Sequence, residues 1–180
     1  MIAHDPPGNE PAVLAAAAPL FERADQLCIL VESIEGAVAT YSQLFAVTRW
    51  RVYRYGPDTV PELGYRGGDG RFSMWVALSD SVPQIELIES ISGPSLYTEW
   101  IAEHGFGFHH VGVFTSSIAT SLQALTARGM SVSQWGRGYG LDGDGGFAYV
   151  DSLEQLGFVL ELIEIPKRRR PPDREWVVTR

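Results

Sequence analysis

Residues 26–41 read QLCILVESIEGAVATY, and residues 110–125 read HVGVFTSSIATSLQAL. Each stretch begins with a short apolar run typical of a β-strand, passes a serine that can cap a helix, and continues with apolar residues at helical spacing. A shift of 84 positions without gaps places Gln26 on His110, Ser33 on Ser117 and Val38 on Leu122. The chain therefore contains an internal repeat of a strand followed by an amphipathic helix.

Three further strand-like segments follow each unit, separated by turns rich in glycine and proline. They lie near residues 49–55, 72–78 and 84–88 in the first half, and near 131–134, 147–150 and 158–163 in the second. Each half thus reads β-α-β-β-β. We predict an α+β fold in which two βαβββ modules form a cupped mixed sheet around one metal site.

This organisation divides the 180-residue chain into five segments. We expect a flexible N-terminal arm at residues 1–20 and a first module at residues 21–92. A linker with a short helix follows at residues 93–107, then a second module at 108–166 and a basic C-terminal tail at 167–180. The tail opens with a basic run from Lys167 to Arg170, which we expect to be solvated.

Composition excludes several classes of protein. A net charge of −8 argues against a general nucleic-acid binder, which needs clustered Lys and Arg to neutralise phosphates. No apolar run reaches the roughly 18 residues of a membrane span, and no basic, apolar leader opens the chain, so we expect a cytoplasmic protein. Cys28 is the only cysteine, which excludes an intramolecular disulfide and a cysteine-rich zinc site.

One polar residue interrupts an apolar β segment in the first and last strand of each module. These residues are Gln26, Glu86, His110 and Glu161. Side chains alternate between the two faces of a strand, so the flanking apolar residues can pack under the helices while the polar ones point to the opposite face. In a closed cup the four polar groups would meet in a dry cavity, where unpaired carboxylates are costly. A divalent cation would remove that cost.

The four groups supply one imidazole nitrogen, two carboxylates and one amide oxygen. This donor set suits Zn²⁺, Ni²⁺, Co²⁺ or Mn²⁺ and leaves positions for water or a bidentate substrate. It suits Ca²⁺ less well, because Ca²⁺ prefers more oxygen ligands and no imidazole.

Three longer motifs resemble a known family. Residues 84–89 read QIELIE, residues 93–113 read GPSLYTEWIAEHGFGFHHVGV, and residues 156–164 read LGFVLELIE. Together with the repeat they resemble methylmalonyl-CoA epimerase-like proteins over residues 25–166, within the vicinal-oxygen-chelate (glyoxalase/bleomycin resistance/dioxygenase) superfamily. Epimerases of this kind usually have His first and Gln second, whereas the order Gln26, Glu86, His110, Glu161 is similar to that of glyoxalase I.

The resemblance implies a metal-dependent lyase or isomerase that removes a proton next to a carbonyl and forms a metal-stabilised enediolate. Gln26, Glu86, His110 and Glu161 would be the metal ligands, and Glu161 or Glu86 would also act as the catalytic base. The implied substrate is a small carbonyl compound, with thioesters and thiol adducts among the candidates. A homodimer is the usual form of such two-module relatives.

Two other functions remain open at this point. The same cup can serve a small-molecule binding or resistance protein without turnover. An Fe(II) extradiol dioxygenase is disfavoured, because its triad of two His and one carboxylate would need His where Gln26 stands. Five further residues can line the cavity: Arg66, Trp75, Arg137, Tyr139 and Tyr149. Aromatic residues in strands more often pack in the core.

Neighbouring polar residues receive weaker assignments. Strand alternation places His109 on the face opposite His110, as a support or packing residue. Glu89 and Glu164 also fall on the opposite face, near strand ends, where we expect them to be solvated. Glu62 lies in a loop loosely similar to one that carries an acid/base Glu in the epimerases.

Overall fold

The structure, a computed structural model, describes residues 18–179, so most of the predicted N-terminal arm lies outside the described residues. The first repeat is observed as β1 (Gln26–Leu30), α1 (Ile34–Leu44), β2 (Arg49–Tyr55), β5 (Ser73–Ser79) and β6 (Gln84–Ser92). The second is β7 (Gly107–Phe114), α3 (Ile118–Thr126), β8 (Val132–Arg137), β9 (Gly146–Val150) and β10 (Val159–Glu164). The remaining elements are β3 (Glu62–Tyr65), β4 (Gly68–Asp69), α2 (Leu96–His104), α4 (Leu153–Leu156) and β11 (Arg174–Val177).

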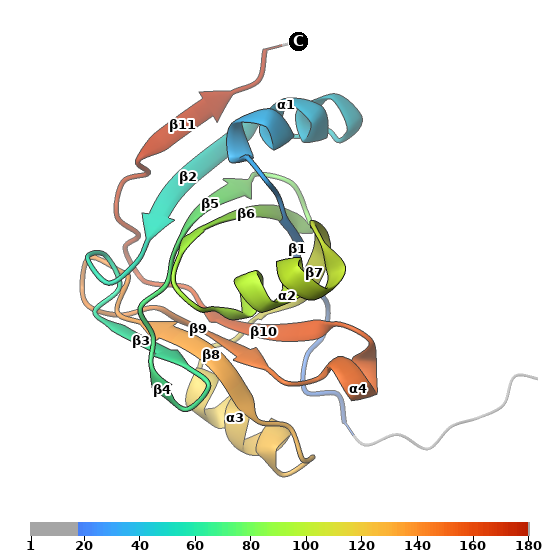
Figure 1. The fold of residues 1–180 in the computed structure, drawn as a ribbon, viewed down its shortest axis with the longest axis vertical. Coiled ribbons are helices and arrows are strands. Elements are labelled where there is room, and N and C mark those ends of the chain that lie inside the picture. Colours follow the sequence, from blue (N-terminus) through green and yellow to red (C-terminus); the bar gives the residue numbers. More distant parts are fainter. Residues whose placement is uncertain (1–17, 180) are drawn as a thin grey trace, which may run out of the picture.

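All strands belong to one 11-stranded mixed sheet with the order β11-β2-β5-β6-β1-β7-β10-β9-β8-β3-β4. The order is symmetric about the antiparallel pair β1–β7, because β6 runs parallel to β1 and β10 runs parallel to β7. The sheet curls so that β2, β5 and β6 face β8, β9 and β10 (Figure 1). The predicted cupped mixed sheet is confirmed.

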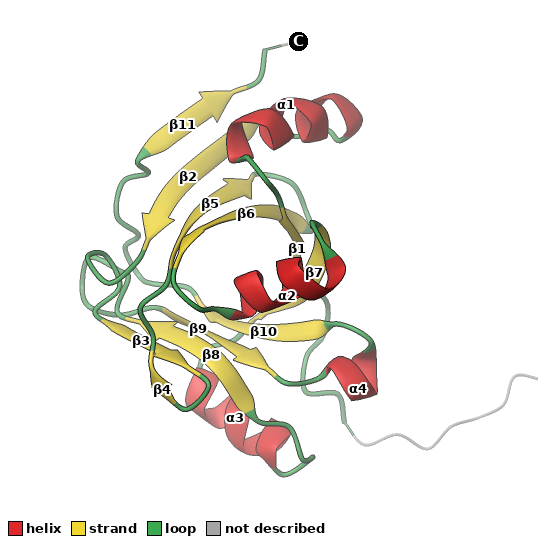
Figure 2. Cartoon of the chain, in the orientation of Figure 1, coloured by secondary structure: helices red, strands yellow, loops and turns green. Residues whose placement is uncertain are grey.

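The helices α1 and α3 cover the outer surface of the curl (Figure 2). Ile34 and Val38 of α1 pack on buried Leu87 of β6, and Ile118 of α3 packs on Leu162 of β10. A third apolar cluster fills the interior and joins residues of β2, β5, α2 and β9. The longest helix, α1, has 11 residues, and no helix between residues 18 and 179 is long and apolar enough to span a membrane.

The first backbone N–H of each outer helix donates a hydrogen bond to a carboxylate from the last strand of its own half. The backbone N–H of Ile34 donates to Glu89 Oε2 at 2.9 Å, and that of Ile118 donates to Glu164 Oε2 at 3.1 Å. The expectation that Glu89 and Glu164 are solvated is therefore wrong. The first N–H groups of a helix lack intrahelical partners and carry partial positive charge, so a carboxylate is stabilised there.

Two strands, β3 and β11, each pair with a strand from the other half of the chain. β3 comes from the first half and pairs with β8, while β11 follows the second half and pairs with β2. Between residues 167 and 179 the chain is thus not the solvated tail that the basic run suggested, because residues 174–177 form a strand and Arg169 stacks on tyrosine rings.

We predict that residues 21–92 do not fold alone. Isolation of this segment removes β7 from β1, β11 from β2 and β8 from β3, and it opens the interior cluster to water. Circular dichroism and thermal scans should show no cooperative unfolding transition for this fragment, in contrast to the full chain. A stable, cooperative monomer of residues 21–92 would contradict the dependence of one half on the other.

Candidate metal centre

Four adjacent strands place the predicted polar residues in two neighbouring rows across the interior face. In the first row Cys28 lies between Glu86 of β6 and His110 of β7. In the second row Gln26 is opposite Gly112, which is in turn opposite Glu161 of β10. Gly112 has no side chain, and the side chains of Gln26 and Ile163 occupy the space above it.

The imidazole of His110 contacts both carboxylates. Its Nε2 lies 3.1 Å from Glu86 Oε2 and 2.9 Å from Glu161 Oε2. Gln26, Glu86, His110 and Glu161 are all buried, and His110 is completely inaccessible. The structure therefore brings the side chains of His110, Glu86 and Glu161 together, and Gln26 lies in the same row as Glu161.

The polar atoms at this point lack conventional partners. Gln26 Oε1, Glu86 Oε2, His110 Nε2 and Glu161 Oε2 are buried and accept or donate no hydrogen bond of acceptable geometry, although the His110 distances are short enough for one. The Gln26 amide is held by a hydrogen bond from its Nε2 to Gln84 Oε1 at 2.9 Å, which leaves Oε1 free. Buried polar atoms without partners are rare in folded proteins, and a cation would satisfy all four.

Burial and neighbouring charges shift the pKa values of His110 and Glu161 in the metal-free centre. Burial opposes the charged form of His110, but the adjacent Glu161 and Glu86 carboxylates outweigh it and raise the pKa of His110 to about 9. Burial also raises the pKa of Glu161, and the attraction of His110 opposes that rise. Without a metal, an imidazolium between two carboxylates compensates part of their charge. A divalent cation would replace that proton.

His109 supports His110 from the same side of the sheet. The pairing of β1 with β7 skips a residue, since Cys28 is opposite His110 and Ile29 is opposite Phe108. This β-bulge rotates His109 inward, where its Nδ1 lies 2.8 Å from Nδ1 of His110. Burial and the neighbouring His110 lower the pKa of His109 to about 2, so the neutral ring can accept a hydrogen bond. The predicted opposite orientation was wrong, because alternation fails at a bulge.

Cys28 is a neighbour of the centre that we did not predict. Its Sγ and one ligand atom each from Glu86 and His110 lie within 4.8 Å of one another. Burial and the charges of Glu86 and Glu161 raise the pKa of the thiol well above its usual value. Its position was available from the sequence, because a residue two places after Gln26 shares the same strand face.

The centre opens onto a small cavity of about 40 Å³ inside the cup. Its wall includes Tyr139 and Tyr149, which also belong to the interior apolar cluster, so both expectations hold for these rings. The other candidates, Arg66, Trp75 and Arg137, do not line it. The hydroxyl of Tyr97 donates to that of Tyr149 at 2.9 Å. Glu62 is exposed on β3 and does not line this cavity, so the loop likeness to an acid/base Glu finds no support.

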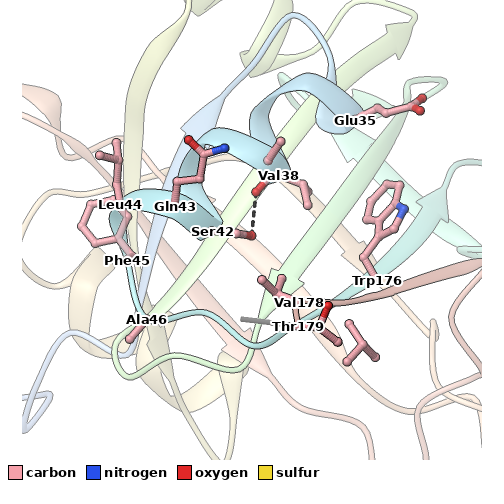
Figure 3. Close-up of a pocket in the computed structure, with 12 residues that line it drawn as sticks. Glu35, Val38, Ser42, Gln43, Leu44, Phe45, Ala46, Trp176, Val178 and Thr179 are labelled. Carbon is pink, nitrogen blue, oxygen red and sulfur yellow. Dashed lines mark hydrogen bonds between the residues drawn. The ribbon is translucent and has the colours of Figure 1, made fainter.

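A larger hollow of about 940 Å³ lies on the surface between α1 and β11 (Figure 3). Among its lining residues only Glu35 is ionisable, and Ser42 bonds to the backbone oxygen of Val38. Size alone would favour this hollow, but it lacks groups that could hold a metal or transfer a proton in concert. The candidate site is therefore the smaller interior cavity.

Comparison with known proteins identifies the family of this fold. Residues 25–149 match the model of the Glyoxalase/Bleomycin resistance protein/Dioxygenase superfamily. The chain belongs to this superfamily. No curated protein sequence matches it.

Several solved structures share this superfamily fold. A methylmalonyl-CoA epimerase from Mycobacterium tuberculosis is 19% identical to this chain, with a TM-score of 0.60. The match covers 85% of this chain and 95% of the epimerase chain. A hypothetical protein from Bacillus halodurans is 19% identical with a TM-score of 0.59, covering 82% and 97%. A variant methylmalonyl-CoA epimerase from Streptomyces coelicolor, in complex with 2-nitronate-propionyl-CoA, is 13% identical with a TM-score of 0.57, covering 80% and 97%. At these identities the likeness establishes the fold alone.

Replacement of Gly112 by alanine should weaken metal binding more than it weakens folding. A Cβ at this position would lie 2.9 Å from Gln26 Oε1 and 2.8 Å from Ile163 Cδ1, so the Gln26 amide must move away. We expect Gly112→Ala to lower metal affinity by about tenfold, the lower end of the effect of disturbing groups around a metal site. Competition with a chelating dye measures the change.

Gly36→Ala is the matched control, because nothing lies within 4 Å of a Cβ built there. This variant should keep the metal affinity of the unmodified chain. An unchanged metal affinity in Gly112→Ala would show that the Gln26 oxygen does not contribute to binding.

Proposed function

We propose that this protein is a metal-dependent isomerase or lyase that removes a proton next to a carbonyl group. The observation that carries the proposal is that Glu86 Oε2 and Glu161 Oε2 lie 3.1 Å and 2.9 Å from His110 Nε2. These three atoms and Gln26 Oε1, in the adjacent strand β1, are buried without hydrogen-bond partners. These are the four predicted ligand atoms, one from each of four neighbouring strands.

The donor set fits Zn²⁺, Ni²⁺, Co²⁺ or Mn²⁺. When bound, such an ion would act as a Lewis acid that polarises a carbonyl oxygen of the substrate. His110 would bind through Nε2, because its Nδ1 already contacts His109. Cys28 is the alternative to Gln26 as fourth ligand, since coordination to a metal would deprotonate its thiol despite the raised pKa.

The chain itself would move the proton. In the proposed step the C–H bond beside the carbonyl breaks, the proton passes to a carboxylate oxygen of Glu161, and the electron pair passes to the carbonyl oxygen. Burial raises the pKa of Glu161, which brings a carboxylate closer to the basicity that the task requires. The Tyr97 hydroxyl donates to Tyr149, so the Tyr149 proton is available to Glu161 or to a substrate oxygen. Glu86 is the second candidate for the base.

The size of the cavity bears on the substrate. About 40 Å³ accommodates an ion and a few waters, whereas ligand sites usually measure several hundred Å³. A substrate would therefore enter only when part of the wall moves. The ligand named with the Streptomyces coelicolor structure is a CoA thioester, which supports a thioester among the candidate substrates.

We further propose a cytoplasmic homodimer, as is usual for two-module relatives.

A binding or resistance protein without turnover is the second candidate. The cavity wall is rich in aromatic rings, which suits the enclosure of an apolar ligand. This function would need neither the bound ion nor a carboxylate base, so the two experiments below separate the candidates.

We predict one equivalent of a divalent transition metal per chain. His110→Ala and Glu161→Ala should each leave too few ligands for tight binding and should reduce occupancy to a small fraction. Elemental analysis of protein purified without chelator gives the stoichiometry, and Glu164→Ala serves as a control because that carboxylate faces α3 instead of the centre. Full occupancy in both His110→Ala and Glu161→Ala would refute the assignment of the centre.

We also predict metal-dependent proton exchange in D₂O. Metal-loaded protein should introduce deuterium beside the carbonyl of at least one compound among α-hydroxy ketones, hemithioacetals and 2-substituted acyl thioesters. Glu161→Gln removes the basic oxygen while the amide can still bind the ion, so exchange should fall by at least about a hundredfold in protein that stays metallated. Proton NMR of the substrates measures the rate.

Undiminished exchange in metallated Glu161→Gln would assign the base to Glu86 or another group. If no compound exchanges and metal-free protein binds an apolar ligand tightly, the binding-protein alternative would replace the proposed enzyme.

A further inference from the structure

A strap formed by residues 165–173 runs from β10 to β11 and closes one side of the cavity. Hydrogen bonds hold it near its middle and at its C-terminal end, since Leu141 N donates to Arg168 O at 2.9 Å and Asp173 N donates to Val52 O at 2.8 Å. Figure 1 shows this chain leaving β10 and reaching the outer edge of β2. The strap therefore joins the two halves of the cup at its rim.

The strap carries three consecutive arginines in different surroundings. Arg168 pairs with Asp142 on the surface, and Arg170 pairs with Asp173 at 2.9 Å. Arg169 alone lines the cavity that contains Glu86 and Glu161.

Arg169 is a partly buried cation among neutral rings. Its guanidinium carbon lies 5.3 Å from the ring centroids of both Tyr53 and Tyr139, and its Nη1 donates to the Tyr55 hydroxyl at 2.9 Å. In the part of the chain from residue 18 to residue 179, no carboxylate lies within ion-pair distance of it. Ring faces compensate a cation only in part, and a guanidinium has five N–H donors.

We propose that Arg169 binds a carboxylate group of the substrate, opposite the centre formed by Glu86, His110 and Glu161. The proposal rests on the proposed function in taking the same cavity as the substrate site. It narrows the substrate to a carbonyl compound that also carries a carboxylate, with one end at the metal centre and the anionic end at the strap. A guanidinium suits this task because its N–H groups match the geometry of a carboxylate.

A purely structural role for Arg169 makes a different prediction. If it only anchors the strap on Tyr53 and Tyr139, its loss should change stability and weaken charged and neutral ligands alike. If it binds a carboxylate, its loss should remove the preference for a charged ligand over a neutral ligand of the same shape. The ratio of the two affinities therefore separates the roles.

The test uses malonate and succinate as probes, each compared with its monoamide by isothermal titration calorimetry. Titrations use the full chain in metal-loaded and metal-free forms, for the unmodified protein, Arg169→Met, Arg169→Lys and Arg168→Gln. Methionine keeps apolar contact with the rings, lysine keeps the charge, and Arg168→Gln removes a neighbouring surface cation of the strap. Thermal scans of each variant establish that it is folded.

We expect the unmodified protein and Arg168→Gln to prefer at least one dicarboxylate over its monoamide by about tenfold or more, as a charged hydrogen bond would provide. Arg169→Met should bind both members of that pair equally, and Arg169→Lys should retain part of the preference. Equal binding of both members by the unmodified protein, absence of binding to all four probes, or an unchanged preference in folded Arg169→Met would each overturn the proposal.

The metal-free titrations separate this proposal from the proposed function. A preference that Arg169→Met abolishes would support the role of Arg169 even if the protein binds no metal, in which case the proposed chemistry alone fails. Metal-dependent proton exchange without any preference for the charged ligand would support the proposed chemistry and contradict the role of Arg169.

Discussion

Two buried carboxylates face one imidazole inside the cup, and the other features of the interior accommodate this arrangement of charge. Glu86 and Glu161 come from strands on opposite sides of the β1–β7 pair, so they approach His110 only when four strands are in register. Burial of a carboxylate without a compensating charge costs several kcal/mol. The centre can therefore exist only in the closed sheet, and the exchange of β3 and β11 between the halves helps to keep that sheet closed.

The repeated sequence ELIE explains how each half supplies both a site residue and a helix contact. It occurs at residues 86–89 and 161–164. An odd separation of three residues places the two carboxylates of each copy on opposite faces of the strand. The first carboxylate, Glu86 or Glu161, points into the cup, and the second receives the first N–H of the outer helix. The two halves share this arrangement, whereas the paired positions Gln26 and His110 carry different donors.

Local periodicity accounts for what the sequence could predict. The alternation of polar and apolar residues identified Gln26, Glu86, His110 and Glu161 as inward-facing, because that pattern is a property of a single strand. His109 was misplaced because its orientation follows from a bulge, which depends on how β1 pairs with β7. The pairing partners of β3 and β11 likewise depend on contacts distant in sequence. Glu89 and Glu164 were placed on the correct face, but the helix end that they meet is a tertiary contact.

The net charge of the cavity would couple a metal bound at the proposed centre to an anion bound at the strap. In the metal-free protein the raised pKa of His110 favours an imidazolium beside the Glu86 and Glu161 side chains, and Arg169 lines the same cavity as these two side chains. A divalent ion with neutral His110 would offset both carboxylates by itself, so Arg169 would remain as an uncompensated positive charge. An anion should then bind more strongly to the metal-loaded cavity than to the metal-free one. Because coupling between two binding sites is reciprocal, the anion should strengthen metal binding by the same factor. A divalent metal ion at the proposed centre and the Arg169 cation on the strap would thus together favour anionic ligands.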